Sequence, residues 1–219
     1  MPVKPAHFIV LAFLVVFLVV LLQLQVLGLV LDKLGLSPEG AATLLFATLI
    51  GSLINLPLFR IHGEPAEAEP PPELPPWILG RIRPYTGETL ISVNVGGALI
   101  PVAFSLYLLV RQQLPLLDVV IATAIVSAVS YAFSQPIKGM GIGMPLLLAP
   151  LVTAFTALML APDDAAPLAY VSGTLGVLIG ADLLHLKDIP RLATPMASIG
   201  GAGTFDGIFF TGILAVLLT

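Results

Sequence analysis

The stretch at residues 180–212, GADLLHLKDIPRLATPMASIGGAGTFDGIFFTG, decides the fold and carries two acidic residues, Asp182 and Asp206, within strongly apolar sequence. An ionisable side chain at membrane depth costs about 2.5–3.5 kcal/mol on insertion scales, and such a residue marks a functional site by default. We therefore expect the rest of the chain to surround this pair of acids with membrane helices.

The composition indicates a polytopic membrane protein. Hydrophobic residues make up 58% of the 219 residues and charged residues only 10%, and the mean hydropathy is +1.05. A soluble domain usually contains about 25% charged residues. Several apolar runs approach the length of about 20 residues that a transmembrane helix needs, so the lipid bilayer is the predicted partner.

The composition also excludes several function classes. The chain has no cysteine, which excludes disulfides, thiolate catalysis and cysteine-ligated zinc. The net charge of -4 comes mostly from one loop and gives no indication of nucleic-acid binding. Carboxylate and imidazole groups suit Zn or Mn, but the spacing of the nearest candidates matches no strong ligand motif: Asp182, His185, Asp188 and Asp206. We predict no metal, no cofactor and no nucleic-acid partner.

The fold class predicted from the apolar runs is an all-α membrane protein with about seven transmembrane helices in a single domain over residues 1–219. The predicted spans are residues 8–31, 41–59, 89–110, 116–133, 144–160, 166–184 and 196–218. Between the second and third spans, residues 62–84 are rich in Pro and Glu. This composition predicts an extended, solvated cytoplasmic linker within the domain.

The third span begins irregularly. Ile91, Val93 and Val95 alternate with polar residues, and Gly96-Gly97 follows directly. Two structures fit this pattern, namely a short extended segment near residues 89–97 or a helix broken at the glycines. Irregular backbone at membrane depth persists only when it is buried in protein or lines a wet cavity.

The positions of Lys and Arg predict the orientation. Seven spans place the two chain ends on opposite sides of the membrane. The side of the N-terminus then receives seven of the nine basic residues, and the other side receives Lys33 and Arg111. Cytoplasmic loops carry an excess of Lys and Arg, so we expect the N-terminus in the cytoplasm and the C-terminus outside.

With this orientation, polar groups from five segments meet in the cytoplasmic half of the bundle. Asp182 lies near the cytoplasmic end of its span, and Asp206 lies about 10–15 Å deep in the next span at 1.5 Å per residue. The predicted binding residues belong to the same half or flank Asp206: Asn55, Asn94, Lys138, Gly203 and Gly207. Glycines beside an acid allow backbone or a substrate strand to approach closely.

Two carboxyl groups held close together cannot both ionise cheaply, so they share a proton and their pKa values separate. One group then acts as a general base and the other as a general acid, as in aspartic proteolysis. We predict Asp182 and Asp206 as the catalytic pair.

The segment GTFDGIFFT at residues 203–211 resembles the Gly-x-Gly-Asp segment of presenilin-type and signal-peptide-peptidase-type intramembrane aspartyl proteases. The resemblance implies that Asp206 is the second catalytic aspartate and that the substrate is a transmembrane peptide. The sequence departs from the family pattern in three ways. Phe205 stands where the family has glycine, Ala181 rather than tyrosine precedes Asp182, and no Pro-Ala-Leu tripeptide follows.

Nearly the whole chain outside the acidic linker resembles a family of uncharacterised prokaryotic integral membrane proteins. The motifs that carry this resemblance are Asn55-Leu-Pro57, residues 94–101, residues 136–142, Gly180-Ala-Asp182 and residues 203–207. The resemblance implies a location in a prokaryotic cell membrane and a shared site, but no reaction.

Two other functions remain open. The glycine- and proline-interrupted spans near residues 96–101 and 139–145 resemble the discontinuous helices of transporters, and Asp206 would then couple a solute or ion to protonation. Alternatively, the protein is a non-catalytic membrane scaffold. In that case Asp182 is a helix-end residue paired with Lys187 or Arg191, and the asparagines only join helices.

Overall fold

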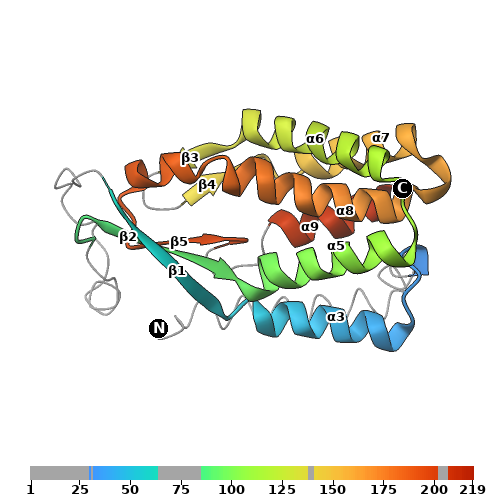
Figure 1. Cartoon of the computed structure of the whole chain (residues 1–219), viewed down its shortest axis with the longest axis horizontal. Helices are drawn as coiled ribbons and strands as arrows, with labels where there is room; N and C mark the ends of the chain where they lie inside the picture. Colours follow the sequence, from blue (N-terminus) through green and yellow to red (C-terminus); the bar gives the residue numbers. More distant parts are fainter. Residues whose placement is uncertain (1–29, 31, 64–84, 138–140, 202–206) are drawn as a thin grey trace.

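The protein is a helical bundle with a small β-sheet at one end (Figure 1). The computed structural model describes the chain except for residues 1–29, 31, 64–84, 138–140 and 202–206. The helices are α3 (Pro38–Gly51), α5 (Ile100–Arg111), α6 (Leu116–Phe133), α7 (Leu148–Leu160), α8 (Ala165–Val177) and α9 (Gly207–Leu218). The π-helical segment η1 (Val95–Leu99) precedes α5, and a second one, η3 (Leu178–Leu183), extends α8. Two 3-10 segments are present as well, η2 (Pro162–Asp164) before α8 and η4 (Leu186–Leu192) after η3.

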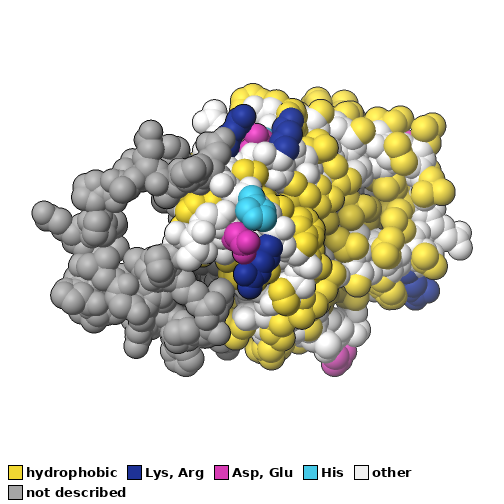
Figure 2. All heavy atoms as spheres, turned by 60° about the vertical axis from the view of Figure 1, so that its left-hand side comes forward, with side chains coloured by type: hydrophobic (Ala, Val, Ile, Leu, Met, Phe, Trp, Pro, Cys, Tyr) yellow, Lys and Arg dark blue, Asp and Glu magenta, His cyan; other side chains and the backbone are white. Residues whose placement is uncertain are grey.

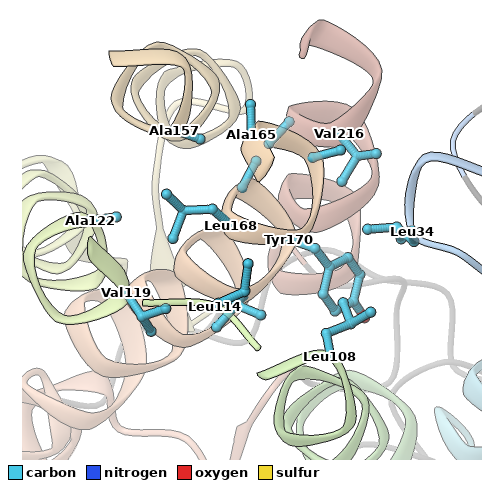
Figure 3. Close-up of a cluster of buried hydrophobic side chains, with 14 of the residues drawn as sticks. Leu34, Leu108, Leu114, Val119, Ala122, Ala157, Ala165, Leu168, Tyr170 and Val216 are labelled. Carbon is cyan, nitrogen blue, oxygen red and sulfur yellow. The ribbon is translucent and has the colours of Figure 1, made fainter. Parts of the chain in front are cut away.

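Helix α8 is the centre of the bundle and is buried along almost its whole length. Its sequence, AAPLAYVSGTLGV, is rich in small residues, which allow neighbouring helices to approach closely. Figure 3 shows Leu168 and Tyr170 of α8 among side chains of the surrounding helices. The Tyr170 ring packs edge-on against Phe104 of α5, with centroids 4.9 Å apart.

The sheet at the end of the bundle has the strand order β1-β2-β5. β1 (Asn55–His62) is antiparallel to β2 (Glu88–Asn94), and β5 (Met196–Ile199) is parallel to β2. A second pair of short strands, β3 (Gln135–Ile137) and β4 (Gly141–Gly143), connects α6 to α7. β2 and β5 end side by side, with Val93 opposite Ile199. The start of η1, which follows β2, and the turn that follows β5 therefore lie next to each other.

Two predicted spans are wrong in part. Residues 41–59 were predicted as one helix, but α3 ends at Gly51 and the chain continues as strand β1. Residues 196–218 were predicted as one helix, but Met196–Ile199 form a strand and α9 begins only at Gly207. In both segments the apolar run is shared between a helix and a strand, and pairing with β2, distant in sequence, decides where the strand forms.

At the irregular start of the third span the structure has the first predicted alternative, a short extended segment, and the helix that follows is continuous from Val95 to Arg111. β2 is extended through Asn94, and the backbone then widens into the π-helix η1 at Gly96-Gly97 before α5 begins. The span at residues 8–31 and the linker lie almost wholly outside the described residues, except that His62 belongs to β1.

The prediction of about seven transmembrane helices is not confirmed. Among the described residues, two helical stretches are long and apolar enough to cross a membrane, Leu116–Phe133 and Pro162–Leu183. The other described apolar helices are shorter. In length and composition these two stretches are consistent with a membrane protein.

Replacing Gly96 with alanine should lower the free energy of unfolding by about 1–3 kcal/mol, the usual cost of overpacking. A Cβ at this position would overlap the backbone of α3 at Thr48 and Ser52, where η1 crosses that helix. Thermal or denaturant unfolding in detergent measures the change.

The matched control is Gly40→Ala in the first turn of α3. Its Cβ would meet Ser37 and Leu36 only at ordinary distances of 3.5 and 3.7 Å. This variant should be neutral or more stable by up to about 1 kcal/mol, because alanine restricts the unfolded chain. If both variants unfold alike, the close crossing of α3 and η1 is contradicted.

Candidate functional site

Asp182 lies in the π-helical extension of α8. The widened turn is marked by the hydrogen bond from the Leu184 backbone N–H to the Ile179 carbonyl, five residues back, at 2.9 Å. Gly180 packs directly against α6, where a Cβ would overlap the Ser127 carbonyl oxygen. Single π-turns within α-helices occur frequently at functional sites. Asp182 therefore lies where the α-helical hydrogen-bonding pattern of α8 changes to a π-helical one.

The Asp182 carboxylate is bonded to the turn that follows β5. Its Oδ2 atom accepts a hydrogen bond from the Gly200 backbone N–H at 2.6 Å. Gly200 and Gly201 have φ values of 78° and 102°, in the region that favours glycine. The Gly200 carbonyl also lies against Gly97 of η1, where a side chain would overlap it. The turn at Gly200 therefore contacts η1 at Gly97 and is bonded to η3 through the Asp182 carboxylate.

Asn94, the last residue of β2, holds three elements together. Its Nδ2 group donates to the Ser52 carbonyl at 2.8 Å and to Asn55 Oδ1 at 3.1 Å. Its Oδ1 atom accepts from the Gly97 N–H at 2.7 Å, which caps η1. Ser198 of β5 donates to the same Asn55 oxygen at 2.6 Å. The two predicted asparagines are therefore in direct contact, and Ser198 and the Gly200 turn connect them to Asp182.

A cavity of about 200 Å³ opens beside Asp182. Three buried apolar side chains, Ile91, Ile189 and Leu192, contribute to its lining. All four residues of β5 and Asp182 line it as well. An engineered apolar cavity of about 150 Å³ holds a benzene molecule. The space next to the carboxylate is therefore large enough for one bulky apolar side chain.

Charged side chains gather around the sheet end of the molecule, whereas apolar side chains cover much of the helical surface in the same view (Figure 2). Glu88 of β2 lies 3.2 Å from Arg60 and 3.7 Å from His62, and Arg191 lies 3.8 Å from Asp188. These pairs are largely exposed and contribute little to stability. They place several charged side chains at this end of the bundle.

Two residues near Asp182 have surroundings that the sequence did not reveal. His185, considered from sequence among the weak metal-ligand candidates, is buried, with 5% of the residue exposed. Lys187 was a candidate partner of Asp182, but its ammonium donates to the Tyr131 hydroxyl at 2.9 Å. This hydrogen bond raises the pKa of Lys187.

Several predicted site residues lie outside the described residues, namely Asp206, Lys138 and Gly203. Gly207 is the first residue of α9. Within the described ranges, no group of three or more acidic or histidine side chains is arranged to hold a metal ion. Ser198 was not predicted, although an isolated hydroxyl between apolar residues and a glycine pair is a signal that sequence reading could use.

Asn94→Ala should destabilise the fold by about 2–4 kcal/mol, because it removes hydrogen bonds to Ser52, Asn55 and Gly97, each worth about 1 kcal/mol or more when buried groups are left unpaired. Ser198→Ala is the comparison, since it removes a single bond to Asn55 and should cost about 1 kcal/mol. Unfolding in detergent measures both. If Asn94→Ala is no more damaging than Ser198→Ala, the described network does not hold the three elements together.

Comparison with known proteins agrees with the predicted uncharacterised family. No curated protein and no solved structure matches the chain. One family model, described as "Protein of unknown function (DUF1614)", matches residues 49–218, a span that includes both asparagines and both predicted catalytic aspartates. The chain therefore belongs to the DUF1614 family.

Proposed function

We propose that this protein is a multi-pass membrane hydrolase in which Asp182 and Asp206 form a paired-aspartate site that cleaves transmembrane peptides. The observation that carries the proposal is the 2.6 Å hydrogen bond between the Asp182 carboxylate and the Gly200 N–H. This bond ties the first acid to the segment that leads to the second. Ile208, two residues after Asp206, is buried in the same apolar cluster as Ala181, which precedes Asp182.

The surface of α6 supports a location in the membrane. Leu116–Phe133 has a mean hydropathy of 2.0, yet only 28% of this stretch is buried within the chain. A helix that is apolar on all sides is normally buried in protein or in lipid. Lipid around the exposed part of α6 satisfies this requirement. Helix α7 adds further exposed apolar side chains, including Phe155 and Met159.

The proposed orientation places the sheet end and both aspartates near the cytoplasmic surface of a prokaryotic cell membrane, with the C-terminus outside. Of the basic residues within the described ranges, Arg60, Lys187 and Arg191 lie in the sheet and η4, at the charged end. Cytoplasmic segments carry this excess of positive charge. In this orientation the chain crosses the membrane about seven times.

The chemistry follows from two carboxyl groups that share one proton. The ionised carboxylate takes a proton from a water molecule, whose oxygen attacks the peptide carbonyl carbon, while the protonated carboxyl donates its proton to the carbonyl oxygen. The tetrahedral intermediate then collapses. The carboxyl that took the proton from water donates it to the amide nitrogen, the other carboxylate accepts a proton from a hydroxyl of the intermediate, and the C–N bond breaks to give a carboxylic acid and an amine. The cavity beside Asp182, whose lining includes Ile91, Ile189 and Leu192, would hold a substrate side chain next to the reacting bond.

Asp182→Asn and Asp206→Asn should each lower the rate of cleavage of model transmembrane peptides by about 10²–10⁴-fold, the usual contribution of a general acid or base. The purified proteins are reconstituted in vesicles with the labelled peptides, and the products are identified by mass spectrometry. Asp188→Asn is the matched control, because Asp188 lies outside the pair and contacts Arg191. Cleavage that is equal in the parent and in Asp206→Asn would remove the catalytic assignment.

Ala197→Leu should reduce cleavage of peptides with a bulky apolar residue beside the scissile bond. Ala197 lines the cavity next to Asp182, and the added side-chain atoms would occupy its space. A mismatch of one or two methylene groups in an apolar pocket changes kcat/KM by about 10–200-fold. The measurement compares kcat/KM for peptides with leucine and with alanine at that position. An unchanged preference would show that the cavity does not receive the side chain.

A further inference from the structure

His185 is a buried polar residue that the proposed chemistry does not use. Its side chain is 5% exposed, and its Nδ1 atom lies 3.0 Å from the carbonyl oxygen of Gly180. A carbonyl oxygen can only accept a hydrogen bond, so Nδ1 must carry the proton in this contact. The bond spans five residues and begins within the π-helical segment that contains Asp182.

This contact continues the bonding of the π-helix. Leu184 donates its backbone N–H to the Ile179 carbonyl, five residues back. The next carbonyl in the same series belongs to Gly180, and it accepts from the imidazole of His185. The side chain therefore satisfies the carbonyl at the point where the π-helix ends. A buried carbonyl without a donor would cost free energy, and regular α-helical bonding would offer an alternative.

The imidazole is itself held by α6. Its ring packs on the Tyr131 ring with centroids 4.8 Å apart and a tilt of 38°. The same helix contacts Gly180, through the Ser127 carbonyl. Both ends of the hydrogen bond between His185 and Gly180 are therefore fixed against one rigid element.

We propose that His185 is a positioning residue of the paired-aspartate site, an inference that rests on the proposed function. By satisfying the Gly180 carbonyl it stabilises the π-turn and so holds Asp182 toward Gly200. One residue of α-helix corresponds to a rotation of about 100° about the helix axis. Loss of the extra residue in this turn would therefore redirect the carboxylate away from the β5 turn and the cavity.

The test uses three substitutions at His185 that differ in the position of the N–H group that could donate a hydrogen bond to the Gly180 carbonyl. Asparagine carries its amide nitrogen at the same branch position as Nδ1. Glutamine carries it one carbon farther out, and leucine has no donor. Tyr131→Phe is the matched control, because it keeps the ring that packs on His185 and removes only the hydroxyl that Lys187 contacts.

Two readouts separate this inference from the proposed function. The first is kcat and KM for cleavage of a model transmembrane peptide by the reconstituted full-length protein. The second is amide hydrogen exchange of the segment that contains the Leu184 N–H, together with the ¹³C carboxyl resonance of Asp182, assigned with Asp182→Asn. The second readout needs no catalytic activity and remains valid if the parent protein cleaves nothing.

We expect His185→Leu and His185→Gln to lower kcat by about 10²-fold with little change in KM, the size of effect that a misplaced catalytic group produces. Exchange at Leu184 should accelerate, and the Asp182 resonance should shift in both variants. His185→Asn should restore kcat, exchange and resonance toward the parent values, and Tyr131→Phe should change none of them. The inference is overturned if leucine leaves the exchange and the resonance unchanged, or if asparagine is as damaging as glutamine. If leucine prevents folding, the comparison of asparagine with glutamine still decides.

Discussion

Every buried backbone N–H and carbonyl needs a hydrogen-bond partner, and at this site regular secondary structure does not supply all of them. Two parallel strands end where the sheet meets the helical bundle, and two π-helical segments, η1 and η3, lie next to them. Three side chains satisfy groups that these breaks release. Asn94 pairs with the Gly97 N–H, Asp182 with the Gly200 N–H, and His185 with the Gly180 carbonyl.

This constraint connects the architecture to the chemistry. A carboxylate that accepts from a backbone N–H has a fixed orientation, and its desolvation is partly offset by that bond. The glycines next to it remove the side chains that would separate η1 from the turn after β5. The result is a polar cluster built largely from backbone, next to a small cavity.

The three functions considered from sequence make different demands on these features. A transporter needs discontinuous helices around a site that two sides of the membrane can reach, and the π-turns supply the discontinuity. A scaffold needs only the packing that α8 provides. The protease-like function additionally requires an acid oriented toward a second acid and an adjacent space for substrate. The bond from Asp182 to Gly200 and the neighbouring cavity are the features that favour it.

Local sequence was sufficient for the elements that depend on composition alone. Residues 116–133 form α6 with the predicted bounds, because a continuous apolar run without glycine or proline has no competing structure. The short extended segment before Gly96-Gly97 was also readable, since Ile91, Val93 and Val95 alternate with polar residues and a glycine pair follows. The strands β1 and β5 were not readable, because their partner β2 is distant along the chain and an apolar run alone does not reveal its pairing. The burial of His185 and the contact between Asn55 and Ser198 likewise arise only when α6, β1 and β5 are brought together, since a side chain's partners depend on packing between elements that the linear order does not specify.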